Sequence, residues 1–394
     1  HSAIVVEKRE SLKSWTILLA IVAFGFSLIG AFITRSGIIT SVHAFATDPE
    51  RGVFLLAITA LFMGGALTLF AARAEVLSSK GVFAMLSRES LLVLNNILLA
   101  VAAFVVFVGT IWPLVSELLF DRKLSVGEPF FNLAFTPFFV ALGAALPIGA
   151  MMPWKRAKAG RVLRKLLPAA VLAIAVLALV YALQTGRSAL GPVGLMLATW
   201  LVVGALTDLW ARKGNSPLSR LLRLQRSDYG RVIAHAGLGV TIAGIAGLLA
   251  WQSEDIRVMQ EGESLTLAGY DITLQSVERV QGPNYISTTG QVLLSRNGQN
   301  IATLTPEKRF YPVARMPTTE AGIDNGFLRD VYVVIGDPQD GGGWAFRSYV
   351  KPLANWIWGG AILMALGGAF SLSDRRYRVA AGARKTNVQG VPAE

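Results

Sequence analysis

The chain has 394 residues, of which 53% are hydrophobic and 16% charged, and its mean hydropathy is +0.51. This composition excludes an ordinary soluble globular protein of this length. The formal net charge is +12, but the basic residues fall in alternate short connections between apolar stretches, a pattern that argues against nucleic acid as a partner.

Eight apolar stretches are long enough to cross a lipid bilayer, because a spanning helix needs about 20 mostly apolar residues. In chain order they are residues 15–34, 53–71, 91–111, 133–152, 167–183, 193–210, 232–251 and 356–372. The sequence begins with His1 rather than methionine and shows no signal-peptide pattern, so it looks like a fragment or a processed form. We expect a mainly α-helical polytopic membrane protein, with the lipid bilayer as its solvent.

Basic residues are concentrated on one side of this predicted topology. They cluster before the first stretch, between the fourth and fifth, between the sixth and seventh, and after the eighth, and these four places share one side if every stretch crosses. By the positive-inside rule that side is the cytoplasm. Tryptophans lie near the predicted ends, as an interfacial aromatic belt would place them: Trp15, Trp112, Trp154, Trp210, Trp251 and Trp356.

A long polar region between the seventh and eighth stretches is predicted to be external and β-rich. Polar and apolar residues alternate over 271–278, and Asn297 and Gly298 lie between two strand-like runs, which is a strong hairpin signal. A small sandwich and a partly open barrel both fit this pattern. The predicted domains are 1–251, with seven transmembrane helices and an external His43 loop; 252–352, a periplasmic β-rich domain; 353–373, the last transmembrane helix; and 374–394, a basic cytoplasmic tail.

The chain contains three histidines, His1, His43 and His235, and no cysteine. His235 follows Arg231 by four residues inside the seventh stretch, and ionisable residues within a membrane are functional candidates. The glycines beside it, Gly237 and Gly239, would let a flat ligand or a neighbouring helix approach. A neutral imidazole hydrogen-bonded to another helix is an equally good explanation of His235.

The other two histidines also have two explanations each. His1 would share a membrane leaflet with His235 if a helix led down to it, and two imidazoles at one depth can ligate one haem iron; alternatively, it only marks where the sequence starts. His43 follows the first stretch on the outer face, where a solvated loop histidine is the common explanation. In the third stretch, Asn95 and Asn96 are expected to bridge helices by hydrogen bonds.

The absence of familiar catalytic motifs narrows the chemistry. Without cysteine the chain offers no thiolate nucleophile or thiolate metal site, so redox chemistry must come from a cofactor. No HExxH, Walker or GxGxxG pattern occurs, and no carboxylate and hydroxyl grouping typical of a hydrolase surrounds His43.

Several motifs together resemble the CcmF family of cytochrome c-type biogenesis proteins. The most specific is TRSGIITSVHAFATDPERG, which contains His43. The others, in chain order, are SRESLLVLNN, GEPFFN, RVIAHAGLGV, GPNY, TPEKRFYP, MPTTEAGI and KPLANWIWGG. They are spread over nearly the whole chain. The resemblance implies that the chain is the C-terminal part of such a protein, without its tryptophan-rich segment.

The resemblance implies a role for each histidine. His1 and His235 match the two axial ligands of the iron of a resident haem b in the membrane. His43 matches the external histidine that ligates the iron of the incoming haem, which is the substrate in transit, and it is the implied catalytic residue. The implied activity is that of a cytochrome c haem lyase component, which attaches haem to apocytochrome c at CxxCH and is active only in the intact protein and complex.

The resemblance also implies partners and a location. Haem would arrive from a CcmE-like haem chaperone, CcmH-like and CcmI-like partners would present apocytochrome c, and a quinol would be the reductant. The protein would lie in the bacterial inner membrane. Two rival hypotheses are a membrane transporter, which predicts discontinuous helices and an internal repeat, and a non-catalytic cytochrome assembly scaffold, which predicts a protein without pigment.

Overall fold

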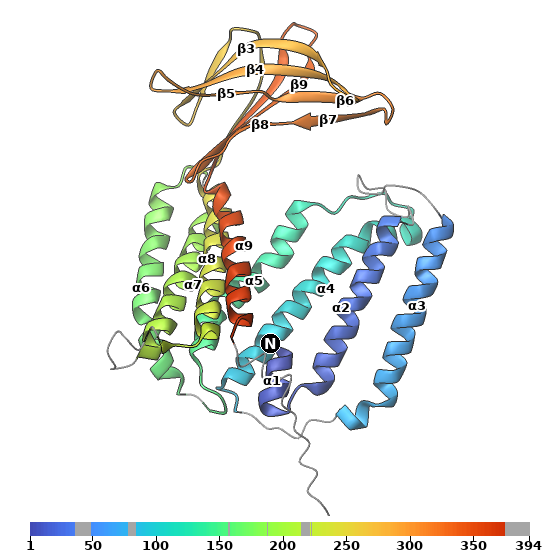
Figure 1. Ribbon diagram of the computed structural model, residues 1–394, viewed down its shortest axis with the longest axis vertical. Helices are drawn as coiled ribbons and strands as arrows, with labels where there is room; N and C mark the ends of the chain where they lie inside the picture. Colours follow the sequence, from blue (N-terminus) through green and yellow to red (C-terminus); the bar gives the residue numbers. More distant parts are fainter. Residues whose placement is uncertain are drawn as a thin grey trace, which may run out of the picture. The chain divides into compact units, whose positions relative to one another are not determined.

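The computed structural model describes residues 1–35, 49–77, 84–156, 158–186, 188–213, 221 and 223–374. The chain divides into two compact units, His1–Arg164 and Lys165–Glu394. In the described part of the chain, eight helices are long and apolar enough to cross a membrane (Figure 1). The predicted fold class, an α-helical membrane protein with eight spans and one β-rich domain, is confirmed.

The first unit holds four of these helices and a short helix that the sequence did not indicate. Its elements are α1 (Ser2–Arg9), α2 (Lys13–Arg35), α3 (Pro49–Ala72), the 3-10 helix η1 (Ala74–Leu77), α4 (Arg88–Phe120) and α5 (Glu128–Met151). Ser87 caps α4 by accepting the Ser90 backbone N–H at 3.2 Å. Helices α2 and α4 meet through Phe26 and Phe107, whose ring centroids are 5.0 Å apart.

The second unit holds α6 (Ala159–Leu183), most of which lies beyond Arg164, together with α7 (Leu190–Lys213), α8 (Arg226–Trp251) and α9 (Ala354–Leu372). Small residues bring α8 against both neighbours. A Cβ on Gly237 would lie 2.8 Å from the Gly360 carbonyl of α9, and one on Gly239 would lie 2.9 Å from the Ala198 carbonyl of α7. Of the two predicted uses of these glycines, close packing of helices is therefore the one observed.

Adjacent glycines on α9 give a matched test of this packing. A Cβ on Gly360 would collide with Thr241 and with the Gly237 carbonyl, whereas a Cβ on Gly359 would meet nothing within 4 Å. We expect Gly360→Ala to lower the unfolding free energy by about 1–3 kcal/mol through overpacking. Gly359→Ala should be neutral or stabilising by up to about 1 kcal/mol, because alanine favours helix. Thermal unfolding of the two variants in detergent compares them, and equal melting temperatures would contradict the packing argument.

The polar region between α8 and α9 forms two antiparallel sheets. The strands are β1 (Ser253–Met259), β2 (Ser264–Leu267), β3 (Tyr270–Gln281), β4 (Ile286–Arg296), β5 (Gln299–Leu304), β6 (Glu307–Tyr311), β7 (Met316–Glu320), β8 (Gly322–Asp324), β9 (Arg329–Pro338) and β10 (Trp344–Pro352). One sheet has the order β1-β10-β9-β8; the other has β2-β3-β4-β6-β7, with β5 paired to β4. The predicted Asn297-Gly298 hairpin is confirmed: Arg296 pairs with Gln299, and both turn residues have positive φ.

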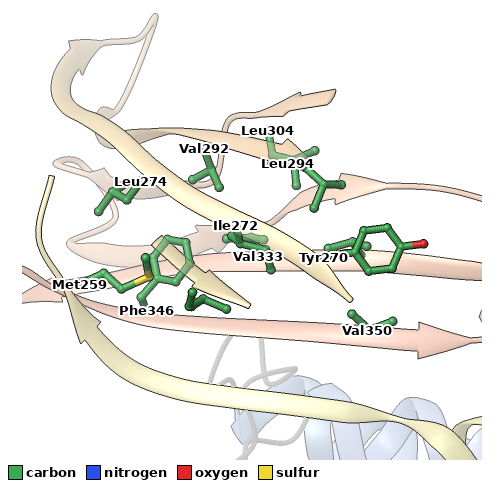
Figure 2. Packing of buried hydrophobic residues seen from close by; sticks show 12 residues of the cluster. Met259, Tyr270, Ile272, Leu274, Val292, Leu294, Leu304, Val333, Phe346 and Val350 are labelled. Carbon is green, nitrogen blue, oxygen red and sulfur yellow. The ribbon is translucent and has the colours of Figure 1, made fainter. Parts of the chain in front are cut away.

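Both sheets contribute to one apolar core. Figure 2 shows side chains such as Ile272 and Val292 from one sheet packed with Val333 and Phe346 from the other. These four residues are at most 1% exposed. The shared core between two sheets makes the domain a sandwich, which decides between the two predicted architectures.

The sandwich is joined directly to two packed helices. Strand β1 begins two residues after Trp251, the last residue of α8, and β10 ends two residues before α9 begins. Ser253 of β1 pairs with Val350 of β10, so the chain leaves and re-enters the helices through neighbouring strands. The sandwich is therefore held to the α8–α9 pair by two adjacent connections.

Candidate functional site

The first part of the candidate site is His235 on α8. It is the tenth residue of the helix, about 14 Å along the axis from Arg226, and its side chain is half-buried. Spacings of four residues place Arg231, His235 and Gly239 on one side of α8, and Gly239 faces α7. Within the residues that the structure describes, no hydrogen bond holds the imidazole to another helix. The helix-bridging explanation of His235 therefore has no support here.

A cluster of four charged residues lies about one turn from His235. Asp208 of α7, only 6% exposed, accepts from Arg231 at 2.8 Å and from Arg212 at 3.3 Å. Asp228 of α8 pairs with Arg212 at 2.9 Å and lies 3.5 Å from Arg231. The cluster joins α7 to α8 next to the imidazole. Two ion pairs cross between the helices, Asp208 with Arg231 and Arg212 with Asp228.

This cluster corrects two of the helix boundaries predicted from the sequence. Arg212 and Arg231 were expected to lie in a basic connection, but both lie within helices, because α7 ends at Lys213 and α8 begins at Arg226. Neither Asp208 nor Asp228 was recognised from the sequence. The available signal was Asp208 itself, a lone carboxylate inside the apolar stretch 193–210.

The second part of the candidate site is His1, at the start of α1 in the first unit. The His1 Nδ1 atom lies 2.9 Å from the Asn95 amide of α4, and Asn96 donates to the Ser2 hydroxyl at 2.7 Å. The prediction that Asn95 and Asn96 bridge helices is confirmed, although their partner is the short helix α1 rather than another span. The contact occupies Nδ1 and leaves the Nε2 atom of His1 for a ligand.

The opposite end of α1 is fixed by a buried carboxylate. Glu89 of α4 is fully buried and forms an ion pair with Arg9 at 2.8 Å. Both of its oxygens also accept the Lys155 backbone N–H at 3.1 Å. Arg9 follows Ser2 by seven positions, and Asn96 follows Glu89 by seven positions. Because Ser2 bonds to Asn96 and Arg9 pairs with Glu89, α1 runs antiparallel along α4 between two polar anchors. These anchors position His1.

The three expected ligands lie in separate parts of the chain. His1 and His235 belong to different compact units, so their pairing stays a prediction. His43 lies outside the described residues. Among the residues described, no group of three or more His, Asp or Glu side chains forms a metal site. An imidazole donor set of one or two ligands is the kind that haem iron uses.

Both the sandwich and the whole chain are similar to known proteins. Residues 250–352 match the family model described as CcmF C-terminal beta-sandwich. The chain is 64% identical to cytochrome c-type biogenesis protein ccl1 of Rhodobacter capsulatus, over 98% of this chain and 59% of that protein. It is 42% identical to cytochrome c-type biogenesis protein CcmF of Escherichia coli, over 99% of this chain and 60% of that protein.

A solved structure shares the fold. The chain superimposes on a protein titled Cytochrome c Heme Lyase CcmF with a TM-score of 0.72 and 23% identity, over 95% of this chain and 57% of that one. The chain thus spans about three fifths of the length of the relatives that it matches. The helices and the sandwich occur together in that structure as they do in this chain.

Proposed function

Because the chain belongs to the CcmF family of cytochrome c-type biogenesis proteins, we propose that it is the haem-handling part of a cytochrome c haem lyase in the bacterial inner membrane. The observation that carries this proposal is the half-buried imidazole of His235 within a membrane span, in a chain so similar to cytochrome c biogenesis proteins. The sandwich between α8 and α9 is then the periplasmic domain, and the basic ends lie in the cytoplasm.

A resident haem b suits the residues around His235. The imidazole lacks a hydrogen-bond partner among the described residues, and the Nε–H of Arg231, one turn away, is buried without a hydrogen-bond acceptor there. An imidazole can ligate the iron of a haem, and a guanidinium N–H can donate a hydrogen bond to a haem propionate. His235 and His1 would hold the iron, and the bound haem would supply one-electron transfer to keep the incoming haem iron ferrous.

Asn95 supports the assignment of His1. Histidines that bind metals almost always hydrogen-bond through the second ring nitrogen, which fixes the tautomer and the ring orientation. The Asn95 amide Nδ2 atom contacts Nδ1 of His1 at 2.9 Å. For Nε2 to present its lone pair to iron, Nδ1 must carry the hydrogen and the Asn95 amide must turn its oxygen to accept it. The Glu89–Arg9 anchor holds α1 against α4, so the imidazole is presented from a fixed helix.

His43 would ligate the iron of the incoming haem on the outer face. In the proposed reaction each apocytochrome cysteine thiol adds across a haem vinyl group, with the sulfur bonding to one carbon and the hydrogen to the other. The addition needs no net oxidant, so the protein contributes binding, orientation and control of the iron's oxidation state. A CcmE-like chaperone would deliver the haem, and CcmH-like and CcmI-like partners would present the CxxCH segment.

Replacement of His43 tests the proposed activity. In cells that depend on this protein, His43→Ala should lower the yield of mature cytochrome c by more than about tenfold. Replacing a residue that only hydrogen-bonds to a metal ligand already lowers metal affinity or activity by about 10–100-fold. Haem-loaded chaperone should accumulate at the same time. Ser41→Ala, in the same segment, is the matched control and should leave both quantities unchanged. Normal cytochrome c maturation by the His43 variant would contradict the assignment.

A further inference from the structure

The loop between β8 and β9 presents two large apolar side chains to its surroundings. Phe327 is 77% exposed and Leu328 is 63% exposed. They follow Gly326 at the tip of the loop, which spans residues 325–328 between the β8 and β9 strands (labelled in Figure 1). Two adjacent exposed apolar side chains are more favourably placed in an apolar medium than in water.

The loop is fixed to the first turn of the membrane span α9. The Trp356 indole N–H donates to the Phe327 carbonyl at 2.9 Å, and the two ring centroids lie 5.6 Å apart. The Leu353 backbone N–H donates to the Leu328 carbonyl at 2.8 Å. Phe327 and Leu328 therefore lie at the level where α9 begins. Trp356 and Trp251, at the adjoining ends of α9 and α8, are the residues expected at a membrane interface.

The backbone carbonyls of loop residues 326–328 are bonded inward. Asn355 donates to the Gly326 carbonyl at 2.9 Å, so the carbonyls of Gly326, Phe327 and Leu328 all accept a hydrogen bond from α9 or the residue before it. Asp330 is buried and accepts from the Gly326 N–H at 3.0 Å and from Asn355 at 2.9 Å. Because these groups are satisfied, the tip can enter an apolar medium without leaving them unpaired.

The nearest charges do not oppose such an insertion. Arg329 pairs with Asp324 and donates to the Tyr270 hydroxyl at 2.6 Å, so its guanidinium is held against the sandwich. Lys351 lies over the Tyr332 ring, 4.4 Å from its centroid. These two cations are therefore held away from the exposed side chains of Phe327 and Leu328, and the exposed polar side chain of the loop is that of Asn325.

We propose that Phe327 and Leu328 are a membrane anchor of the sandwich, inserted into the lipid at the interface where α9 enters the bilayer. The occupant is lipid rather than a protein, because the loop is bonded to a spanning helix at the height of its interfacial tryptophan. The anchor would add a third attachment to the two strand connections and hold one face of the sandwich against the bilayer.

The absence of cysteine makes a depth measurement direct. Single variants Phe327→Cys and Leu328→Cys would be spin-labelled in the otherwise cysteine-free protein and reconstituted in phosphatidylcholine nanodiscs. Collision with oxygen, which concentrates in lipid, is compared with collision with a water-soluble nickel chelate. Val313→Cys in the β6–β7 turn is the matched control, because Val313 is apolar and 98% exposed. Leu328→Cys keeps the test valid if loss of the Phe327 ring disturbs Trp356.

Labels at 327 and 328 should collide mainly with oxygen, and the label at 313 mainly with the nickel chelate. Nickel accessibility at 327 and 328 equal to that at 313 would overturn the anchor by placing the loop in water. Protection of both positions from both reagents would also overturn it, because the loop would then be covered by protein.

Discussion

His235→Ala should abolish the visible absorption of a b-type haem in the purified protein. Of the ionisable side chains of α8, the His235 imidazole lies deepest in the span, and it has no hydrogen bond within the described structure. Removal of this axial ligand would leave the iron with one protein donor at most. The measurement is an absorption spectrum of oxidised and reduced protein, normalised to protein concentration. We expect the haem absorption bands to disappear completely, not merely to shift in wavelength.

Thr241→Ala is the matched control for this experiment. Thr241 lies on the same helix, but it faces α9, where its hydroxyl donates to the Ile357 carbonyl at 3.3 Å. This variant should keep its pigment. An unchanged spectrum in His235→Ala would contradict the ligand assignment, and loss in both variants would point to helix packing. An unmodified protein without pigment would favour the transporter or the scaffold over the haem-handling function.

The spans were predictable because their signal is local. About 20 consecutive apolar residues are sufficient to indicate a transmembrane helix, whatever surrounds them. The Asn297-Gly298 hairpin was predictable for a similar reason, since positive φ at two successive turn residues strongly favours that dipeptide. Each of these features is decided by residues next to each other in the chain.

The features that escaped prediction depend on contacts between distant residues. Helix α1 has only eight residues and carries several charges, so it gave no membrane or amphipathic signal; Asn95, Asn96 and Glu89 of α4 hold it in place. Helix α8 begins six residues before the predicted stretch. The charged residues in its first turns can lie in a helix there because Asp208 pairs with Arg231 and Arg212 pairs with Asp228. A hydropathy average treats these charged residues as breaks in a membrane span, whereas in the folded protein they form ion pairs.

The charged cluster of Asp208, Arg212, Asp228 and Arg231 is expected to stabilise the packing of α7 against α8. Asp208→Ala should lower the unfolding free energy by about 1–3 kcal/mol, because Arg231 loses its closest carboxylate but is 26% exposed and keeps Asp228 at 3.5 Å. Arg212 also loses one of its two carboxylates, although Asp228 remains. Thermal or denaturant unfolding in detergent measures this loss.

Lys123→Ala is the matched control for Asp208→Ala. The ion pair of Lys123 with Glu117 is 3.8 Å long, and the lysine side chain is 89% exposed, so its loss should cost no more than about 1 kcal/mol. Because Asp208 also fixes α7 to α8 beside His235, its replacement should reduce the haem content, which Lys123→Ala should not change. Equal stability of the two variants would show that the cluster does not hold α7 to α8, and the position of His235 would then depend on the small-residue packing of α8 alone.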